Sequence, residues 1–208
     1  MKEVSSSFLC EKSSIDLIHV LNNSHTDYIH FDVMDGNFVN NRFLTIKELK
    51  QTLSLSTKKN DIHLMVSNPI EYIKEISSYN ISFITIHYEI DNLEECINLI
   101  KSYGIKVGVA LKPKTKIEKI YSLLDKIDVV LIMSVNPGAS GQQFITNTKQ
   151  KIDSLKHEIK KRKSHVLIEV DGGIEENVLQ YIKNADIVVS ASFILKDLKN
   201  IDIIKKAN

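Results

Sequence analysis

The feature that most restricts the fold of this chain is a repeated alternation of two kinds of segment. Short runs rich in β-branched residues are each followed by a longer stretch in which apolar residues recur every three or four positions, as on one face of a helix. We expect eight strands, at residues 3–9, 28–33, 62–66, 83–87, 106–111, 129–135, 166–170 and 187–190. We expect eight helices, at residues 14–22, 45–53, 69–77, 93–103, 116–125, 148–161, 175–183 and 198–205.

The predicted strands read as parallel strands. Residues 129–133 are continuously apolar, as expected for strands covered by helices on both faces. Eight such strands alternating with eight helices can close into a TIM (β/α)8 barrel, and 208 residues is near the small end of that fold. An open doubly wound sheet is the alternative, but residues 8–13 lack the glycine-rich turn that usually follows its first strand. No linker divides the chain, so we expect one α/β barrel domain over residues 1–208.

The amino-acid composition limits the cellular compartment and the kinds of binding partner that we expect. A chain of this length can fold without disulfides, and its two cysteines, Cys10 and Cys96, fit a reducing compartment. With no recognisable secretory leader, we expect a cytoplasmic protein. Lys and Arg total 27 against 26 Asp and Glu, which argues against nucleic acid or a membrane surface as the main partner. The basic run 160–163 is interpreted as a solvated helix end.

Polar residues gather where the predicted strands end, which is the catalytic end of a barrel. Alternation along the second strand places His30 and Asp32 on one face, together with Met34. His63 comes near the end of the third strand, and Asp171 ends the seventh. Two imidazoles and two carboxylates converging on the axis would suit a divalent ion such as Zn²⁺, Fe²⁺, Mn²⁺ or Co²⁺.

Simpler interpretations stand beside this one. A histidine in a strand is more often a hydrogen-bonded core residue than a ligand, and Asp-Gly is commonly just a turn. His87, at the end of the fourth predicted strand, could brace the site or simply pack, and packing is the favoured interpretation. The metal hypothesis gains from the combination, because apolar strands seldom bury charged groups without a partner or an ion.

A phosphate site is indicated by three loops. The loop from Gly138 to Gly141 has small residues that could wrap a phosphate in backbone N–H groups or close as a lid, and a plain surface loop is the alternative. The loops after the seventh and eighth strands, the usual phosphate site of this fold, carry Gly172 with Gly173 and Ala191 with Ser192. A phosphorylated small substrate is therefore plausible.

Taken together, these motifs resemble the ribulose-phosphate 3-epimerase family. The likeness runs from Ser5 to about Leu195, and any one of its motifs alone would be weak. In this order and at this spacing they are specific, and they read HFDVMDG at 30–36, HLMV at 63–66, NP at 68–69, VGVAL at 107–111, MSVNPG at 133–138 and EVDGG at 169–173.

The resemblance implies a metal-dependent epimerase that interconverts D-ribulose 5-phosphate and D-xylulose 5-phosphate in the pentose phosphate pathway. By motif, His30, Asp32, His63 and Asp171 would be the metal ligands, with Asp32 and Asp171 as the two acid/base carboxylates. Ser7 and His63 would contact substrate. The phosphate would lie among Gly138, Ala139, Ser140, Gly141, Gly172, Gly173, Ala191 and Ser192. One divalent metal ion and no organic cofactor would be needed, and a homo-oligomer is possible because family members are commonly assemblies.

Several positions depart from the family pattern. The serine before Ser7 stands where a proline is usual, and the loop after Gly36 lacks the family's histidine and proline. Ala139 and Ser140 replace Phe-Gly in the lid, and Ala191 replaces a glycine. None of these is one of the four proposed ligands. The alternatives are a D-allulose-6-phosphate 3-epimerase, which shares the fold and ligands but takes a six-carbon sugar, and a non-catalytic phosphosugar-binding barrel.

Overall fold

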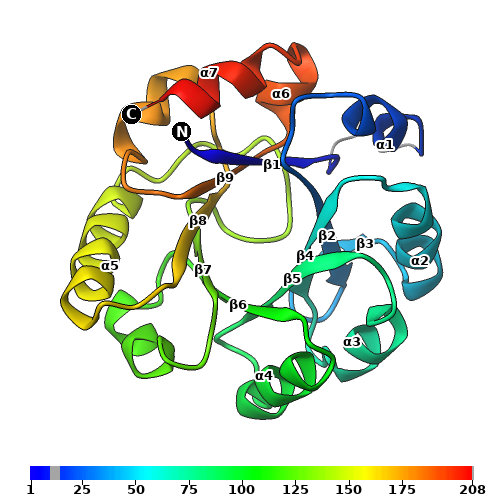
Figure 1. The fold of residues 1–208 in the computed structure, drawn as a ribbon, viewed down its shortest axis with the longest axis horizontal. Helices are drawn as coiled ribbons and strands as arrows, with labels where there is room; N and C mark the ends of the chain where they lie inside the picture. The colour runs from blue at the N-terminus through cyan, green and yellow to red at the C-terminus, as the bar shows by residue number, and fades with distance from the viewer. Residues whose placement is uncertain (10–14, 208) are drawn as a thin grey trace.

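The parallel strands form a closed ring because the first strand pairs with strands from both ends of the sheet (Figure 1). The computed structural model describes residues 1–9 and 15–207. In it, β1 (Glu3–Ser7) runs parallel to both β2 (Tyr28–Asp35) and β9 (Ile187–Ser190). The ring is completed by β4 (Lys59–Met65), β5 (Ile81–His87), β6 (Lys106–Leu111), β7 (Val129–Met133) and β8 (Leu167–Asp171). This closure confirms the TIM barrel and excludes the open sheet.

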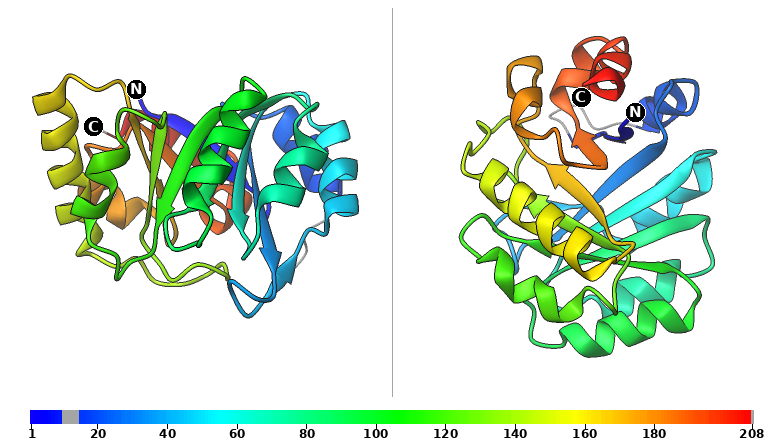
Figure 2. Two further views of the ribbon diagram at one scale, coloured as in Figure 1. Left: turned by 90° about the horizontal axis from the view of Figure 1, so that it is seen from below. Right: turned by 60° about the vertical axis from the view of Figure 1, so that its left-hand side comes forward.

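The helices form an outer ring around the strands, as both views in Figure 2 show. The helices that lie between strands return the chain to the start of the next strand, which is the usual right-handed crossover of parallel sheets, and the last two follow the final strand. The outer ring consists of α1 (Ile15–Asn22), α2 (Ile46–Leu55), α3 (Ile70–Ile76), α4 (Leu93–Ser102), α5 (Thr148–Arg162), α6 (Ser192–Lys196) and α7 (Asn200–Lys206), with the 3₁₀ helices η1 (Ile117–Leu123) and η2 (Glu176–Tyr181).

The structure differs from the sequence-based prediction in its shortest elements. Two segments expected as α-helices form the 3₁₀ helices η1 and η2, whose greater rise of about 2.0 Å per residue spans the same crossover with fewer residues. Two elements were not predicted. These are α6 and the two-residue β3 (Arg42–Phe43), which pairs antiparallel with the end of β2. Both are too short to carry a periodic pattern.

Alternation along the strands divides the buried side chains into two sets. Outward-facing residues such as Phe31 and Ile62 join the large apolar layer between strands and helices. At the end where the strands begin, the barrel is closed by four buried side chains in apolar contact with one another, Tyr28, Phe83, Val129 and Ile187. Above this layer the interior is polar on the side of β1, β2, β4 and β8, and apolar where Ala110, Leu131, Met133 and Val135 cluster.

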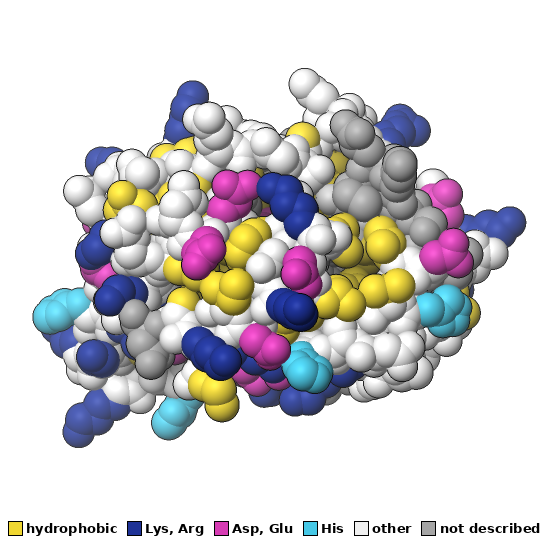
Figure 3. Space-filling model, turned by 90° about the horizontal axis from the view of Figure 1, so that it is seen from above, with side chains coloured by type: hydrophobic (Ala, Val, Ile, Leu, Met, Phe, Trp, Pro, Cys, Tyr) yellow, Lys and Arg dark blue, Asp and Glu magenta, His cyan; other side chains and the backbone are white. Residues whose placement is uncertain are grey.

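The outer surface shows no segregation of charge on the face drawn in Figure 3, where acidic and basic side chains are interspersed. This agrees with the near balance of 27 basic and 26 acidic residues. No helix within the described ranges has both the length and the apolar character needed to cross a bilayer. Cys96 is buried and unpaired in the apolar layer, whereas Cys10 lies outside the described residues.

We predict that Gly108→Ala destabilises the barrel by about 1–3 kcal/mol, because its interior has no room for a methyl group. A Cβ at this position would lie 2.1 Å from Thr85 Oγ1 and 2.9 Å from Thr85 Cβ on the adjacent strand. Urea unfolding of Gly108→Ala, Thr85→Ala and the double variant gives the test. We expect the double variant to lose less free energy of unfolding than the sum of the single losses. Additive losses would contradict the contact.

Candidate active site and metal centre

Four side chains from three strands meet inside the barrel above its apolar floor. His30 and Asp32 come from β2, His63 from β4 and Asp171 from β8. Each offers one nitrogen or oxygen atom, and these four atoms lie within 4.8 Å of one another. Both histidines are fully buried, Asp32 is 4% exposed, and Asp171 is partly exposed to the cavity above. The structure thus brings together the four residues that the sequence singled out.

His30 is held so that one ring nitrogen faces the cluster. Its Nδ1 lies 2.5 Å from Asp61 Oδ2, which also accepts a hydrogen bond of 2.6 Å from Ser5 Oγ. Its Nε2 is buried, lies 3.3 Å from Asp32 Oδ1 and has no hydrogen-bond partner in the described part of the chain. Burial alone would lower the pKa of His30, but the Asp61 and Asp32 carboxylates outweigh it and raise that pKa well above its usual range. Without an ion Nε2 therefore carries a proton, which a bound cation would replace. An unpartnered buried nitrogen beside a carboxylate is what a cation site requires.

His63 is the second imidazole of the cluster and, unlike His30, has both nitrogens in hydrogen bonds. Its Nδ1 lies 3.1 Å from Asp32 Oδ1, and its Nε2 lies 2.9 Å from His87 Nε2 on β5. Burial lowers the pKa of His87 to about 4, more than the neighbouring Glu89 carboxylate raises it. His87 therefore remains neutral near pH 7. The interpretation of His87 as simple packing is wrong, since the residue is bonded directly to the cluster.

The two aspartates are pushed to opposite protonation states. Burial would raise the pKa of Asp32, but the imidazoles of His30 and His63 outweigh it and hold that pKa far below its usual range. Ser7 Oγ also donates a 2.9 Å hydrogen bond to Asp32 Oδ2. Burial, reinforced by the Asp32 charge, raises the pKa of Asp171 to about 6. Asp32 is thus a carboxylate at neutral pH, and Asp171 takes up a proton more readily than an ordinary aspartate.

A second acidic layer lies below the cluster and was not singled out from the sequence. Asp61 and Glu169 are both fully buried, and with His30 they form another group whose ligand atoms lie within 4.8 Å of one another. Burial, and then the Asp61 charge, raises the pKa of Glu169 well above its usual range. The two acids could have been recognised by alternation, because each lies two residues before a proposed ligand on the same face of its strand.

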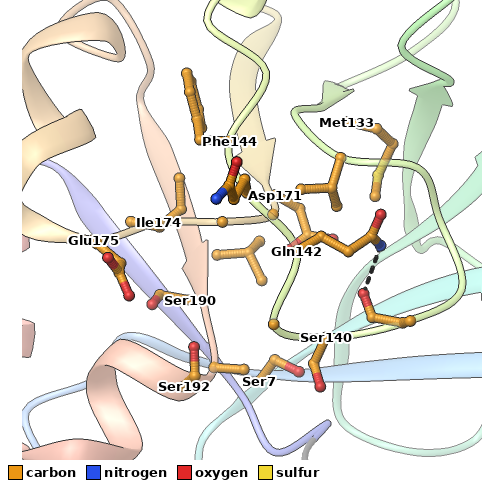
Figure 4. Close-up of a pocket in the computed structure, with 18 of the residues that line it drawn as sticks. Ser7, Met133, Ser140, Gln142, Phe144, Asp171, Ile174, Glu175, Ser190 and Ser192 are labelled. Carbon is orange, nitrogen blue, oxygen red and sulfur yellow. Dashed lines mark hydrogen bonds between the residues drawn. The ribbon is translucent and has the colours of Figure 1, made fainter.

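A cavity of about 660 Å³ opens above the cluster, at the end of the barrel where the strands finish (Figure 4). Asp32 and Asp171 line its floor, whereas His30 and His63 lie beneath it. Ser190 also lines the cavity and was not among the predicted residues. Its hydroxyl is buried and lacks a hydrogen-bond partner among the described residues. The other predicted substrate residues lining the cavity are Ser7, Gly138, Ala139, Ser140, Gly141, Gly172, Gly173, Ala191 and Ser192.

The loop between β7 and α5 lines one side of this cavity. In Figure 1 it runs across the inside of the ring of strands. The Gln142 side-chain amide donates to the carbonyl oxygens of Asn136 and Ala139, at 2.7 and 2.9 Å. Asn41, in the loop after β2, donates a 2.7 Å hydrogen bond to Gly138 O. Hydrogen bonds therefore fix the conformation of this loop, in which Ala139 stands where the family has a phenylalanine.

The glycines and the alanine at the cavity edge have different structural needs. Gly173 has φ +63°, and a Cβ on it would lie 2.6 Å from Phe144 N and 2.8 Å from Gln142 O. Only glycine allows this backbone-to-backbone contact without a shift. Ala191 has φ −107°, outside the left-handed region, so the backbone there accepts the alanine that replaces the family's glycine.

Comparisons with known proteins agree with this geometry. The sequence model described as the ribulose-phosphate 3 epimerase family matches residues 4–195. The ribulose-phosphate 3-epimerase of Buchnera aphidicola subsp. Baizongia pistaciae is 38% identical over 189 residues, covering 88% of this chain and 82% of that protein. The ribulose-phosphate 3-epimerase of Helicobacter pylori strain J99 is 36% identical over 190 residues, covering 88% of each.

Solved structures of other barrels are similar in fold alone. Phosphoribosyl anthranilate isomerase from Thermococcus kodakaraensis superposes with a TM-score of 0.66 at 14% identity, covering 100% of this chain and 98% of that one. The alpha subunit of tryptophan synthase from Campylobacter jejuni superposes with a TM-score of 0.64 at 17% identity, covering 99% and 93%. These likenesses support the TIM barrel.

We predict that the chain, freed of metal by a chelator, binds one Zn²⁺ ion. His30→Ala and Asp171→Asn should each weaken binding about tenfold or more, because each removes one of four converging ligand atoms. Competition against a Zn²⁺-sensitive dye measures this affinity. His157→Ala, an exposed residue of α5, is the control and should bind as the parent does. Equal affinity in His30→Ala and the parent would show that the cluster is only a hydrogen-bond network.

Proposed function

The chain belongs to the ribulose-phosphate 3-epimerase family, and from this we propose that it interconverts D-ribulose 5-phosphate and D-xylulose 5-phosphate through Asp32 and Asp171. The observation that carries the mechanism is the pair of carboxylates on β2 and β8, with pKa values driven apart at the floor of one cavity. Two titratable groups whose surroundings move their pKa values apart are the usual mark of an acid/base pair. The reaction belongs to the pentose phosphate pathway.

Epimerisation at C3 needs proton transfer on both faces of the sugar. The base removes the proton on C3, next to the C2 carbonyl, and the electron pair forms an enediolate. The acid then returns a proton to C3 from the opposite face, inverting that carbon. Asp32, held ionised by its imidazole neighbours, is suited to be the base, and Asp171, with a pKa of about 6, is suited to be the acid. In the reverse reaction the roles exchange.

We propose that His30, Asp32, His63 and Asp171 hold one divalent ion. The fit is supported by the unpartnered His30 Nε2 and by the mixed nitrogen and oxygen donors, which suit Zn²⁺, Fe²⁺, Mn²⁺ or Co²⁺. When bound, the ion would act as a Lewis acid that offsets the negative charge developing on the substrate oxygens. Ser7 donates to Asp32 and would keep that carboxylate oriented toward substrate. No organic cofactor is required by this chemistry.

The phosphate end of the substrate is proposed to lie between the β7–α5 loop and the loops after β8 and β9. Gly172, Gly173, Ala191 and Ser192 would offer backbone N–H groups there. The unpartnered hydroxyl of Ser190 supports this assignment, since a buried donor without an acceptor gains a partner when an anion enters. His63 lies beneath the floor, so its contact with substrate would depend on the substrate reaching into the cluster.

The protein's setting follows the same proposal. A phosphorylated ketose is the partner it must recognise, and neither nucleic acid nor membrane is needed. We propose a cytoplasmic enzyme, in keeping with its buried unpaired Cys96 and with relatives that are bacterial enzymes. We also propose a homo-oligomer, because members of the family are commonly assemblies.

We predict that conversion of D-ribulose 5-phosphate, followed in a coupled assay, disappears on chelation and returns when Mn²⁺, Fe²⁺, Co²⁺ or Zn²⁺ is restored. The reason is that the negative charge of the enediolate would develop beside the Asp32 and Asp171 carboxylates and must be offset there. D-allulose 6-phosphate, assayed in parallel, should turn over more slowly. Faster turnover of the six-carbon sugar would reassign the substrate. Folded protein that turns over neither sugar with any ion would leave only a binding role.

We predict that Asp32→Asn and Asp171→Asn each lower kcat by about 10²–10⁴-fold, since an amide of the same shape can neither take nor give the proton. Steady-state kinetics at saturating metal provides the measurement, with circular dichroism to verify folding. Asp125→Asn, an exposed residue in the turn before β7 at the opposite end of the barrel, is the matched control. If either active-site variant kept parental kcat, that aspartate would not be an acid/base group.

A further inference from the structure

A chain of hydrogen bonds leads from the proposed metal cluster to the rim of the barrel. It begins at His63, passes through His87 on β5, and ends at Glu89 just beyond that strand. We propose that His87 and Glu89 are positioning residues that hold the outer nitrogen of His63, Nε2, as a hydrogen-bond donor, so that Nδ1 is the atom left for a cation in the cluster. This inference rests on the metal site of the proposed function and adds residues that lie outside the ligand quartet.

The central link is a direct contact between two buried imidazoles. His63 Nε2 and His87 Nε2 are 2.9 Å apart, and the ring centroids are 5.0 Å apart. Both residues are fully buried, and the His87 ring also packs on Phe38 with centroids 4.6 Å apart. At this separation a proton must lie between the two nitrogens, so one ring donates and the other accepts.

The direction of that bond is set at the outer end of the chain. Glu89 Oε1 accepts from the backbone N–H of Lys112 at 3.0 Å and from the Thr115 hydroxyl, while Oε2 lies 3.2 Å from His87 Nδ1. A carboxylate held by donors on every side only accepts, so His87 must donate from Nδ1. A neutral His87 then has its lone pair on Nε2 and accepts from His63.

The consequence for His63 follows from the geometry. With Nε2 donating to His87, Nδ1 is the nitrogen of His63 that faces the cluster, 3.1 Å from Asp32 Oδ1. A carboxylate only accepts, so a proton lies between these two atoms until a bound cation takes its place. Glu89 therefore controls, through His87, which nitrogen of His63 is free to bind a metal, in the way that outer carboxylates orient histidine ligands.

Glu89 is itself held by a turn that is anchored from a helix. The Nζ of Lys151 on α5 donates to the carbonyl oxygens of Lys112, Pro113 and Thr115, at 3.1, 2.6 and 2.7 Å. These bonds fix the segment that supplies both donors to Glu89 Oε1. The carboxylate is thus kept in one orientation, which the relay requires.

Glu89→Gln is the decisive variant because it replaces one carboxylate oxygen by an NH₂ group and reverses the donor and acceptor roles along the series of hydrogen bonds. The amide oxygen must face Lys112 N–H, which leaves the amide NH₂ pointing at His87 Nδ1. His87 would then accept at Nδ1 and donate from Nε2, so His63 would carry its one proton on Nδ1. A cation could not replace that proton without leaving His63 with no proton on either nitrogen.

The experiment measures the protonation of His63 and metal affinity in separate steps. Long-range ¹H–¹⁵N spectra of metal-free protein, taken at about pH 8, should show a proton on His63 Nε2 in the parent and none on that atom in Glu89→Gln, where His87 donates instead. Zn²⁺ affinity, from competition with a chelating dye, should fall about 10–100-fold in the variant. Glu94→Gln, which alters an exposed acid paired with Lys126, should match the parent in both readouts.

A second pair of variants separates positioning from packing. His87→Phe keeps a ring against Phe38 but offers no acceptor, and we expect it to lose Zn²⁺ affinity as Glu89→Gln does. His87→Gln, whose amide can both accept and donate, should restore most of that affinity. Equal affinity in His87→Phe and the parent would overturn the proposal.

Two further results would also overturn it. One is the same protonation of His63 Nε2 in the parent and Glu89→Gln, and the other is a changed protonation of that atom with parental Zn²⁺ affinity. Neither measurement uses substrate, so failure here is distinct from failure of the proposed function, which would appear as an absence of ribulose 5-phosphate turnover by the metal-loaded parent.

Discussion

Closure of the barrel is the constraint on which the rest of this structure depends. Because β1 pairs with both β2 and β9, alternate side chains of every strand are forced into an interior with no route to bulk water except the open end. Apolar residues fill that interior where the strands begin. Where they finish, the interior holds histidines and acids, and these must satisfy one another or bind a cation.

Electrostatics in this interior does more than stabilise the fold. Three acids at different depths, Asp171, Asp32 and Glu169, share the same dry environment, and their pKa values are driven in different directions. The imidazoles of His30 and His63 explain the difference, because only Asp32 lies against both. Asp32 and Asp171 are chemically the same group, so the position of the two imidazoles is what separates their pKa values and makes them an acid/base pair.

The surroundings of the two imidazoles are organised by a common rule. In each of the two proposed histidine ligands, the ring nitrogen that points away from the cluster is hydrogen-bonded to a buried side chain. For His30 the partner is the Asp61 carboxylate, and for His63 it is His87, which Glu89 holds in turn. A ring restrained in this way does not have to reorient when an ion binds. The polar side chains inside the barrel therefore form one continuous series of contacts, from the Ser5 hydroxyl on β1 to the turn that Lys151 holds.

The sequence by itself determined the strand and helix alternation and the inward direction of His30, Asp32, His63 and Asp171, because a period of two residues is a local property. It favoured a closed barrel, which the pairing of β1 with both β2 and β9 decided. The tertiary structure alone decided which groups meet. His63 and His87 are 24 residues apart, and His30 and Asp61 are 31 apart, so only strand register brings them into contact. The same register buried Asp61 and Glu169 beneath the ligands. Burial depth and proton direction depend on neighbours from other strands, and no local pattern encodes them.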